Sequence, residues 1–235
     1  MRSRPSPAVA EALSYLADLG YEELLLTAPA AAASPAGSAA SESARPPVAE
    51  AARRLAEQAA AADTCTRCRL AEGRRSVVFG SGAPDADLMF IGEGPGASED
   101  RQGLPFVGPA GALLTRIIEA IELRREEVYI ANVVKCRPPG NRDPQPDEVA
   151  ACRGWLRDQI DTVQPRVIVM LGRVAAQTLL GSDEALGRMR GRWHRVHGVD
   201  ARATYHPAAL LRNASFKRPT WEDMQVVRDR LRESP

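Results

Sequence analysis

The chain contains no run of apolar residues long enough to cross a bilayer, which takes about 20 residues. It also lacks the features of a secretory signal peptide, because residues 1–7 lead into a stretch with four acidic side chains. These are Glu11, Asp18, Glu22 and Glu23. Both absences favour a cytoplasmic protein, and structural disulfides are rare in that compartment. We therefore expect the four cysteines of the chain to serve another purpose.

The 235 residues carry a formal net charge of only +1. This balance excludes a chain that binds nucleic acid through its overall charge, so any such affinity must come from a local patch. Between residues 186 and 218, eight basic residues stand against one acid, Asp200. The basic residues are Arg188, Arg190, Arg192, Arg195, Arg202, Arg212, Lys217 and Arg218. Taken alone, this excess is more typical of a solvated surface than of a binding site.

Internal repeats are absent as well, and composition divides the chain into three parts. Residues 1–27 have the pattern of a short amphipathic helix. Residues 28–47 are rich in Ala, Pro and Ser with almost no large apolar side chains, which is typical of a flexible linker. We therefore expect an N-terminal helical extension (1–27), a linker (28–47) and a globular domain (48–235) large enough for a substantial core.

Within the globular part, four apolar segments have the character of strands, at residues 88–92, 128–132, 167–171 and 203–205. Helical patterns separate them at residues 111–123, 147–163 and 173–180. Strands that alternate with helices are typical of a parallel sheet with helices on both faces. The sequence thus predicts an α/β fold.

The stretch from Gly92 to Gly111 follows the first of these strands and is rich in glycine. Open α/β sheets place their ligand sites at the carboxyl ends of strands, where this stretch begins. Glycine allows the backbone to approach a flat ligand closely. Two carboxylates, Glu93 and Glu99, and one aromatic ring, Phe106, lie within it. This set of side chains can stack on a ring and contact its edge.

The cysteines are arranged as Cys65-x2-Cys68, Cys136 and Cys152. A two-residue spacing aims two thiolates at one metal centre. Four unligated cysteines are the least favoured interpretation, because the first pair lies in a polar stretch. A structural zinc usually uses two Cys-x2-Cys pairs, whereas the second half here is Cys-x15-Cys, which suits an iron–sulfur cluster at least as well. The spacing favours a metal and leaves its identity open.

Two polar residues follow later strands. Asn132 ends the second strand, where an Asn is often a cap or turn residue, but its amide can also accept and donate hydrogen bonds at a base edge. His206 comes directly after the last strand and before Pro207, which keeps it extended. A single His is more often structural than catalytic. Its position at the same sheet edge as Glu93 and Asn132 nevertheless makes it a candidate site residue.

The segment after His206 contains Leu210, Leu211 and Arg212. The two leucines are consistent with an ordinary helix core. They are equally consistent with an apolar wedge at a DNA surface, beside a cation.

Taken together, the motifs resemble the family 4 uracil-DNA glycosylases, the iron–sulfur branch of that superfamily. The resemblance spans roughly residues 65–230 and rests on five features. They are Gly92-Glu-Gly-Pro-Gly-Ala-Ser-Glu-Asp100, Gly103-Leu-Pro-Phe-Val-Gly-Pro-Ala-Gly-x-Leu-Leu114, Asn132-Val-Val-Lys-Cys-Arg-Pro-Pro139, His206-Pro-Ala-Ala-Leu-Leu-Arg212 and the four cysteines in order. Each is weak alone, but five in register are a specific signal.

The resemblance implies a three-layer α/β/α fold around a central four-stranded parallel sheet, and removal of uracil from single- or double-stranded DNA in base-excision repair. It implies a [4Fe–4S] cluster on Cys65, Cys68, Cys136 and Cys152. It carries Phe106 over as the ring that stacks on uracil, Asn132 as the amide that contacts the base edge, and His206 as the residue beside a uracil carbonyl. Glu93, Gly94 and Glu99 correspond to the pocket lining around the sugar and base. For Leu210, Leu211 and Arg212 we expect contact with DNA.

The chain departs from related glycosylases at two places. The best-known uracil-DNA glycosylases have an aspartate where this chain has Gly94, so leaving-group stabilisation is expected to dominate, with backbone groups or Glu93 holding the water. A related subclass forms a covalent adduct through a histidine in the loop that corresponds to residues 137–144, which contains none here. We therefore expect turnover without a covalent adduct. We also expect the enzyme to be a monomer. The N-terminal helix is a candidate for binding another repair or replication protein.

Two rival hypotheses remain at this stage. One is a non-catalytic DNA-binding or polymerase-associated module with structural cysteines, which has no need of Asn132 or His206 in a pocket. The other is a glycosylase of the same fold that removes thymine or hypoxanthine from a mismatch.

Overall fold

The computed structural model describes residues 45–233. The expected N-terminal helix (1–27) and all but the last three residues of the expected linker (28–47) lie outside this range. The helices are α2 (Val48–Asp63), α3 (Leu70–Gly73), α4 (Ala97–Gln102), α5 (Pro109–Ala120), α6 (Pro146–Val163), α7 (Arg173–Leu180), α8 (Leu186–Met189), α9 (Pro207–Arg212) and α10 (Lys217–Arg232), with 3-10 turns at Arg125–Glu127, Pro139–Asn141 and Ala214–Phe216. No helix within 45–233 is both long and apolar enough to span a membrane.

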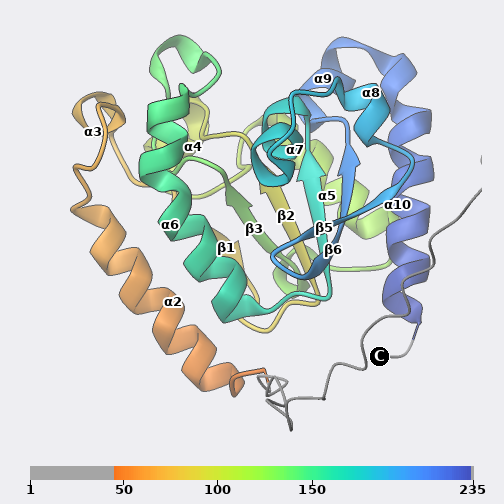
Figure 1. The fold of residues 1–235 in the computed structure, drawn as a ribbon, viewed down its shortest axis with the longest axis horizontal. Coiled ribbons are helices and arrows are strands. Elements are labelled where there is room, and N and C mark those ends of the chain that lie inside the picture. Colours follow the sequence, from red (N-terminus) through yellow and green to blue (C-terminus); the bar gives the residue numbers. More distant parts are fainter. Residues whose placement is uncertain (1–44, 234–235) are drawn as a thin grey trace, which may run out of the picture. The chain divides into compact units, whose positions relative to one another are not determined.

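A six-stranded sheet forms the centre of the fold (Figure 1). Its strands are β1 (Ser81–Gly82), β2 (Leu88–Gly92), β3 (Tyr129–Asn132), β4 (Val167–Leu171), β5 (Trp193–Val196) and β6 (Val199–Thr204), in the order β1-β3-β2-β4-β6-β5. The four inner strands are parallel, whereas β1 and β5 pair antiparallel at the two edges. The expected α/β class with four parallel strands is confirmed, and the sheet extends beyond it by one strand at each edge.

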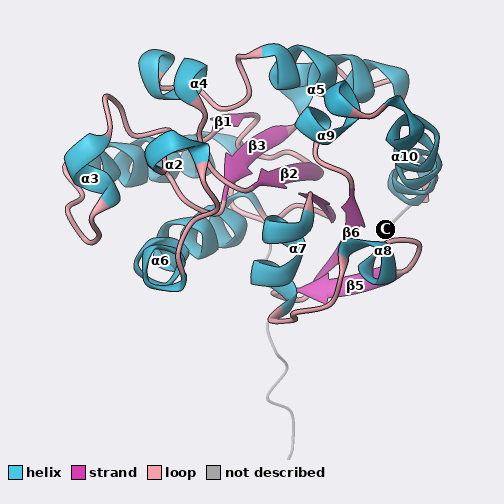
Figure 2. Cartoon of the chain, turned by 90° about the horizontal axis from the view of Figure 1, so that it is seen from above, coloured by secondary structure: helices cyan, strands magenta, loops and turns pink. Residues whose placement is uncertain are grey.

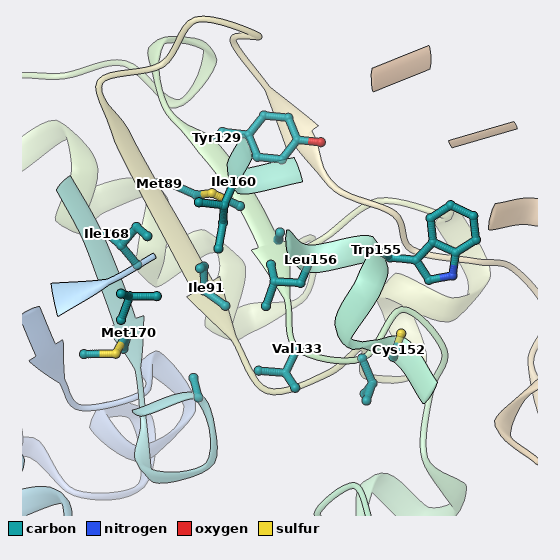
Figure 3. Packing of buried hydrophobic residues seen from close by; sticks show 14 of the residues in the cluster. Met89, Ile91, Tyr129, Val133, Cys152, Trp155, Leu156, Ile160, Ile168 and Met170 are labelled. Atoms are coloured by element: carbon teal, nitrogen blue, oxygen red, sulfur yellow. The ribbon is translucent and has the colours of Figure 1, made fainter. Parts of the chain in front are cut away.

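Side chains of the inner strands alternate between two apolar cores, because successive residues of a strand point to opposite faces. On one face, Met89 and Ile91 of β2 pack with Leu156 and Ile160 of α6 (Figure 3). On the other, Leu88 and Phe90 pack with side chains of α5 and α10. Figure 2 shows α6 and α7 on one side of the sheet and α5 and α10 on the other. The predicted three layers are therefore present.

The antiparallel edge strand β5 runs through the segment that stood out for its basic residues. A tight turn at His197 and Gly198 joins it to β6, and both residues have the positive φ that a two-residue hairpin of type I′ requires (49° and 81°). Most of the segment's cations are paired with carboxylates. Arg190 and Arg202 bind Asp223, Arg192 binds Glu184, Arg195 binds Asp200, and Arg218 binds Glu222. This pairing leaves little of the apparent excess of charge free to attract DNA.

The carboxyl ends of the four parallel strands meet at one edge of the sheet. Gly92 and Asn132 are partners in the register between β2 and β3. Gly172 follows β4, and its N–H donates to the carbonyl of Thr204 at the end of β6 (2.8 Å). His206 comes two residues after Thr204. The topology therefore brings the residues predicted from separate strands to one place.

Candidate active site and cysteine cluster

A cavity of about 540 Å³ opens at this edge of the sheet. Its walls include all six residues predicted to form a base-binding pocket, which are Glu93, Gly94, Glu99, Phe106, Asn132 and His206. Further walls come from the loop around residues 138–143, from the start of α7 and from α9.

Asn132 contributes a buried amide to the cavity. The residue is 1% exposed, and its Oδ1 has no hydrogen-bond partner within the described part of the chain. Gly92 lies beside it, and a Cβ there would come within 2.4 Å of Asn132 Oδ1 and 2.7 Å of Phe106 Cζ. Glycine at this position therefore leaves the amide and the aromatic ring free to share one narrow slot. A buried acceptor without a donor carries a free-energy cost of about 1–3 kcal/mol, which a ligand with an N–H can relieve.

Phe106 is held in an unusual backbone conformation, with φ at 52°. Glu99 supports the turn, because its Oε1 accepts hydrogen bonds from the N–H groups of Val107 and Gly108, both at 2.9 Å. Gly111 completes it, since a Cβ there would lie 1.8 Å from the Phe106 carbonyl oxygen. The structure thus places Glu99 in the cavity wall, where one of its oxygens holds the loop that carries the aromatic ring.

His206 lies across the slot, with its ring centroid 5.5 Å from that of Phe106. The residue caps α9, because its Nδ1 accepts a hydrogen bond from the N–H of Ala208 (3.1 Å). Burial, reinforced by the positive charge of Arg212 and opposed by Glu99, lowers the pKa of His206 to about 4. At neutral pH the ring is therefore neutral, and since Nδ1 is an acceptor, the proton resides on Nε2.

Close packing behind His206 fixes its position. Gly172 has a φ of 91°, and a Cβ on it would lie 2.9 Å from the Cβ of His206. Tyr205, the preceding residue, stacks on Phe216 with centroids 4.2 Å apart, and the guanidinium of Arg190 covers its ring at 4.4 Å. The sequence pattern did not reveal these supports, because their residues are far apart along the chain.

Glu93 is partly buried and lines the cavity. Burial, and to a smaller extent the negative charge of Asp143, raises the pKa of Glu93 to about 7, whereas Arg173 opposes this shift. Asp143 and Arg173 form an ion pair between the loop before α6 and the first residue of α7. Sequence reasoning missed both residues. The adjacent Gly94 has no room for a side chain, because a Cβ would approach Val134 Cγ2 to 2.8 Å.

The segment proposed to contact DNA divides into a buried and an exposed part. Leu210 is only 3% exposed and belongs to the interior, as in the interpretation of the two leucines as an ordinary helix core. Leu211, by contrast, is 53% exposed. Arg212 is exposed on the same short helix and lines the cavity. On a helix, adjacent residues point in different directions, which is why only one leucine of the pair reaches the surface.

All four cysteines line a second, small cavity between α3 and α6. They form no disulfide, and Cys136 and Cys152 are buried. Arg74 donates to Cys136 Sγ (3.4 Å), and the backbone N–H of Lys135 donates to Cys152 Sγ (3.3 Å). Within residues 45–233, no three potential ligand side chains converge on the position of a single metal ion. The structure thus gathers the four thiols around one space without focusing them on one point.

Comparison with known proteins adds independent information. The sequence profile of the Uracil DNA glycosylase superfamily matches residues 79–225. A type-4 uracil-DNA glycosylase from Saccharolobus solfataricus is 43% identical over 180 residues, which cover 73% of this chain and 83% of the relative. One from Thermotoga maritima is 45% identical over 170 residues, which cover 70% and 88%. A type-5 uracil-DNA glycosylase from Pyrobaculum aerophilum is 34% identical over 161 residues, which cover 61% and 70%.

Proposed function

The chain belongs to the uracil DNA glycosylase superfamily, and within it to the type-4 enzymes, and we propose that it hydrolyses the N-glycosidic bond of uracil in DNA with the cavity around Asn132 and His206. The products are free uracil and an abasic site, as in the first step of base-excision repair. The observation that supports the assignment of the site is the buried Oδ1 of Asn132, which has no hydrogen-bond partner among residues 45–233.

Uracil matches this acceptor. Its N3–H can donate to Asn132 Oδ1, while its O4 can accept from the amide nitrogen of the same side chain. Cytosine presents the reverse pattern of donors and acceptors at these two positions. In a closed site such a mismatch leaves buried polar groups unpaired, which is a strong basis for rejection.

A base must leave the duplex stack before it can enter the cavity, at a cost of a few kcal/mol. Stacking on Phe106 recovers part of this free energy, because an aromatic platform contributes about 1–3 kcal/mol per base. The turn held by Glu99 and Gly111 presents the ring rigidly. The slot therefore selects a flat ring by its face through Phe106 and by its edge through Asn132.

Cleavage breaks the bond between C1′ of the sugar and N1 of uracil, and the electron pair leaves with the base. In this proposal, His206 donates its Nε2–H to a uracil carbonyl as negative charge grows there. A neutral imidazole suffices for this task, and burial keeps the ring in that form. His206 thus acts as a fixed hydrogen-bond donor rather than as an acid.

The water oxygen bonds to C1′, and the proton released neutralises the uracil anion. Gly94 offers no carboxylate for this step, so we assign the water to Glu93, the residue before it in the cavity wall. With a pKa of about 7 it is partly ionised at neutral pH and can accept a hydrogen bond from water. The loop at residues 137–144 contains no histidine, so we expect turnover without a covalent adduct.

For the four cysteines we propose a [4Fe–4S] cluster with a structural role. The donor set is four thiols around one space, with Arg74 and a backbone N–H directed at two of the sulfurs. A cluster distributes its thiolates over several irons, whereas zinc requires them to converge on one ion. The cluster would tie the segment between α2 and α3, which carries Cys65 and Cys68, to α6 and to the loop after β3. Iron and acid-labile sulfide in the purified protein would support it, whereas one zinc without sulfide would contradict it.

The remaining proposals concern the surroundings of the enzyme. We propose that it acts as a monomer in the cytoplasm, that Leu211 and Arg212 contact the DNA beside the cavity, and that residues 1–27 bind another repair or replication protein. Single- and double-stranded uracil-containing oligonucleotides are the substrates to compare.

The decisive experiment measures uracil release from a labelled oligonucleotide under single-turnover conditions. We compare the wild type with His206→Ala, with the nearly isosteric Asn132→Asp, and with the control His197→Asn in the hairpin turn. The two site variants are expected to be slower, by about 10²–10³-fold for the loss of a preorganised donor such as His206. The control should match the wild type.

Other results would redirect the interpretation. Failure of the wild type, with its metal content intact, would contradict catalysis and favour a DNA-binding module. Release of thymine or hypoxanthine in preference to uracil would contradict the substrate assignment. Unchanged release by both site variants would leave the activity standing and overturn the roles of Asn132 and His206.

A further inference from the structure

Lys135 is a buried cation that the mechanism above does not use. It is 1% exposed, and no carboxylate forms an ion pair with it within residues 45–233. Its Nζ donates to the backbone carbonyl of Asn132 (2.9 Å) and to Oε1 of Gln159, and it lies 5.7 Å from the ring centroid of Phe79. Burial of an ammonium group is costly, so a residue needed only to fill space would be apolar.

Gln159 holds the other side of this ammonium group and is itself completely fixed. It is fully buried, and its Nε2 donates to the carbonyl of Phe79 (2.9 Å) and to the hydroxyl of Tyr129 (3.1 Å). Since both donor positions are occupied, its Oε1 must face Lys135. These hydrogen bonds therefore fix which end of the Gln159 amide faces Lys135.

This network joins the end of β3 to α6. The partner register of β1 with β3 ends at Ile130, so within residues 45–233 no strand pairs with Asn132 on that side. Lys135 supplies a donor to the Asn132 carbonyl in place of a strand. Gln159 lies on α6, seven residues and about two turns after Cys152, whose sulfur accepts from the backbone N–H of Lys135. Lys135 thus contacts Cys152 through its backbone N–H and the end of β3 through its side chain.

We propose that Lys135 is a positioning residue for Asn132, fixing the carbonyl at the end of β3 against α6 and thereby aiming the amide at the uracil edge. The inference rests on the proposed role of Asn132 in binding uracil. The Oδ1 atom of Asn132 has no hydrogen-bond partner in the described chain to orient it. Its direction therefore follows from its backbone, which pairs with β2 on one side and is tied by Lys135 to Gln159 of α6 on the other.

The test compares Lys135→Met, which retains length and volume without the donor, with Tyr129→Phe as a matched control. Tyr129→Phe removes a buried hydrogen bond from the far side of Gln159 without touching Asn132. Both variants should lose thermal stability. Only Lys135→Met should lower the single-turnover excision rate, by about tenfold to a hundredfold, because small displacements of a positioning group have effects of that order. The affinity for uracil-containing DNA should change by less than threefold in both.

Iron content and the melting temperature confirm that each variant is folded at the temperature of the assay. If Lys135→Met does not fold, Gln159→Leu takes its place, because it removes the anchor of the ammonium group on α6 and should slow excision in the same way. Equal excision rates for the wild type and the variant used, or equal losses in that variant and Tyr129→Phe, would overturn the proposal.

A double-mutant cycle identifies the residue through which Lys135 acts. In an Asn132→Ala background, Lys135→Met should cause no further loss beyond about twofold, since the amide that it positions is absent. Multiplicative losses in the double variant would overturn the inference while leaving the role of Asn132 intact. If Asn132→Ala itself excises uracil at the wild-type rate, the assignment of the site fails instead, and the two failures are distinguishable.

Discussion

Gly92→Ala is the sharpest perturbation of the proposed uracil slot, because it adds one methyl group between the two groups that would recognise the base. The new Cβ would lie 2.4 Å from Asn132 Oδ1 and 2.7 Å from Phe106 Cζ, where ordinary contacts begin at 3.4 Å. The amide oxygen, the ring or the strand must therefore move by about 1 Å. A misplacement of that size typically costs about 10²-fold in rate.

Gly92→Ala should also lower the stability of the fold. Overpacking of a well-filled interior costs about 1–3 kcal/mol, which lowers the melting temperature without unfolding most domains. Gly73→Ala is the matched control, because a Cβ at this position in α3 meets no atom within 4 Å. Single-turnover excision at 25 °C, with melting temperatures and iron content measured in parallel, separates a local effect from unfolding. A folded Gly92→Ala enzyme that excises uracil within threefold of the wild-type rate would refute the slot.

Two further predictions concern the carboxylates of the cavity. The pKa of Glu93 is raised to about 7, so the excision rate should increase with pH through neutrality if the ionised form orients water. Asp143→Asn should move the midpoint of this pH–rate profile to lower pH, because it removes a negative charge that raises the pKa of Glu93. The same raised pKa means that the folded state binds this proton more tightly, so Glu93 destabilises the fold as pH rises through 7. Melting curves at pH 8 should therefore show Glu93→Gln above the wild type, and an unchanged pH profile in Asp143→Asn would contradict the coupling. Glu99→Ala should lower the melting temperature and the excision rate together, because it leaves the N–H groups of Val107 and Gly108 without their acceptor, at a cost of about 1–3 kcal/mol. Glu99→Gln keeps an acceptor oxygen, so its melting temperature and rate should lie between those of Glu99→Ala and the wild type. Equal effects of the two substitutions would argue against support of the loop by Glu99.

The inner strands of the sheet could be predicted because they are buried on both faces. Strands β2 and β4 coincide with the apolar segments at residues 88–92 and 167–171, since a strand between two helical layers has no polar face. The last parallel strand was predicted at 203–205, but β6 begins at Val199. Asp200 and Arg202 interrupt the apolar pattern, so the sequence does not indicate where this strand begins. Arg202 can lie inside only because Asp223 pairs with it, 21 residues further along the chain.

The edge strands could not be predicted, for two different reasons. Strand β1 has only two residues, which is too short for any periodic pattern. Strand β5 lies in a segment dominated by cations, and its hairpin turn uses His197 at positive φ, where a sequence rule would look for Asn, Asp or Gly. In both places the pairing partner, rather than the local sequence, determines the structure.

The gathering of the site residues could be predicted from topology alone, because parallel strands end at one edge. The hydrogen bonds of these residues could not. Glu99 holds the loop of Phe106, and Lys135 contacts the Asn132 carbonyl, through side-chain geometry that no spacing rule specifies. The burial of Leu210 next to the exposed Leu211 is a similar case, since it depends on how α9 rotates against its neighbours. Sequence patterns locate a site, whereas its support requires coordinates.

His206 and Glu93 show why weakly charged side chains suit the proposed reaction. Burial disfavours charge on both, so His206 stays neutral and Glu93 is only partly ionised at pH 7. A permanently charged His206 would bind the uracil anion more tightly after cleavage and slow its release. In the proposed mechanism, charge appears only as the bond breaks, on the base beside the His206 donor and on the sugar near Glu93. Interactions that strengthen only at that stage raise the rate without tightening the binding of the products.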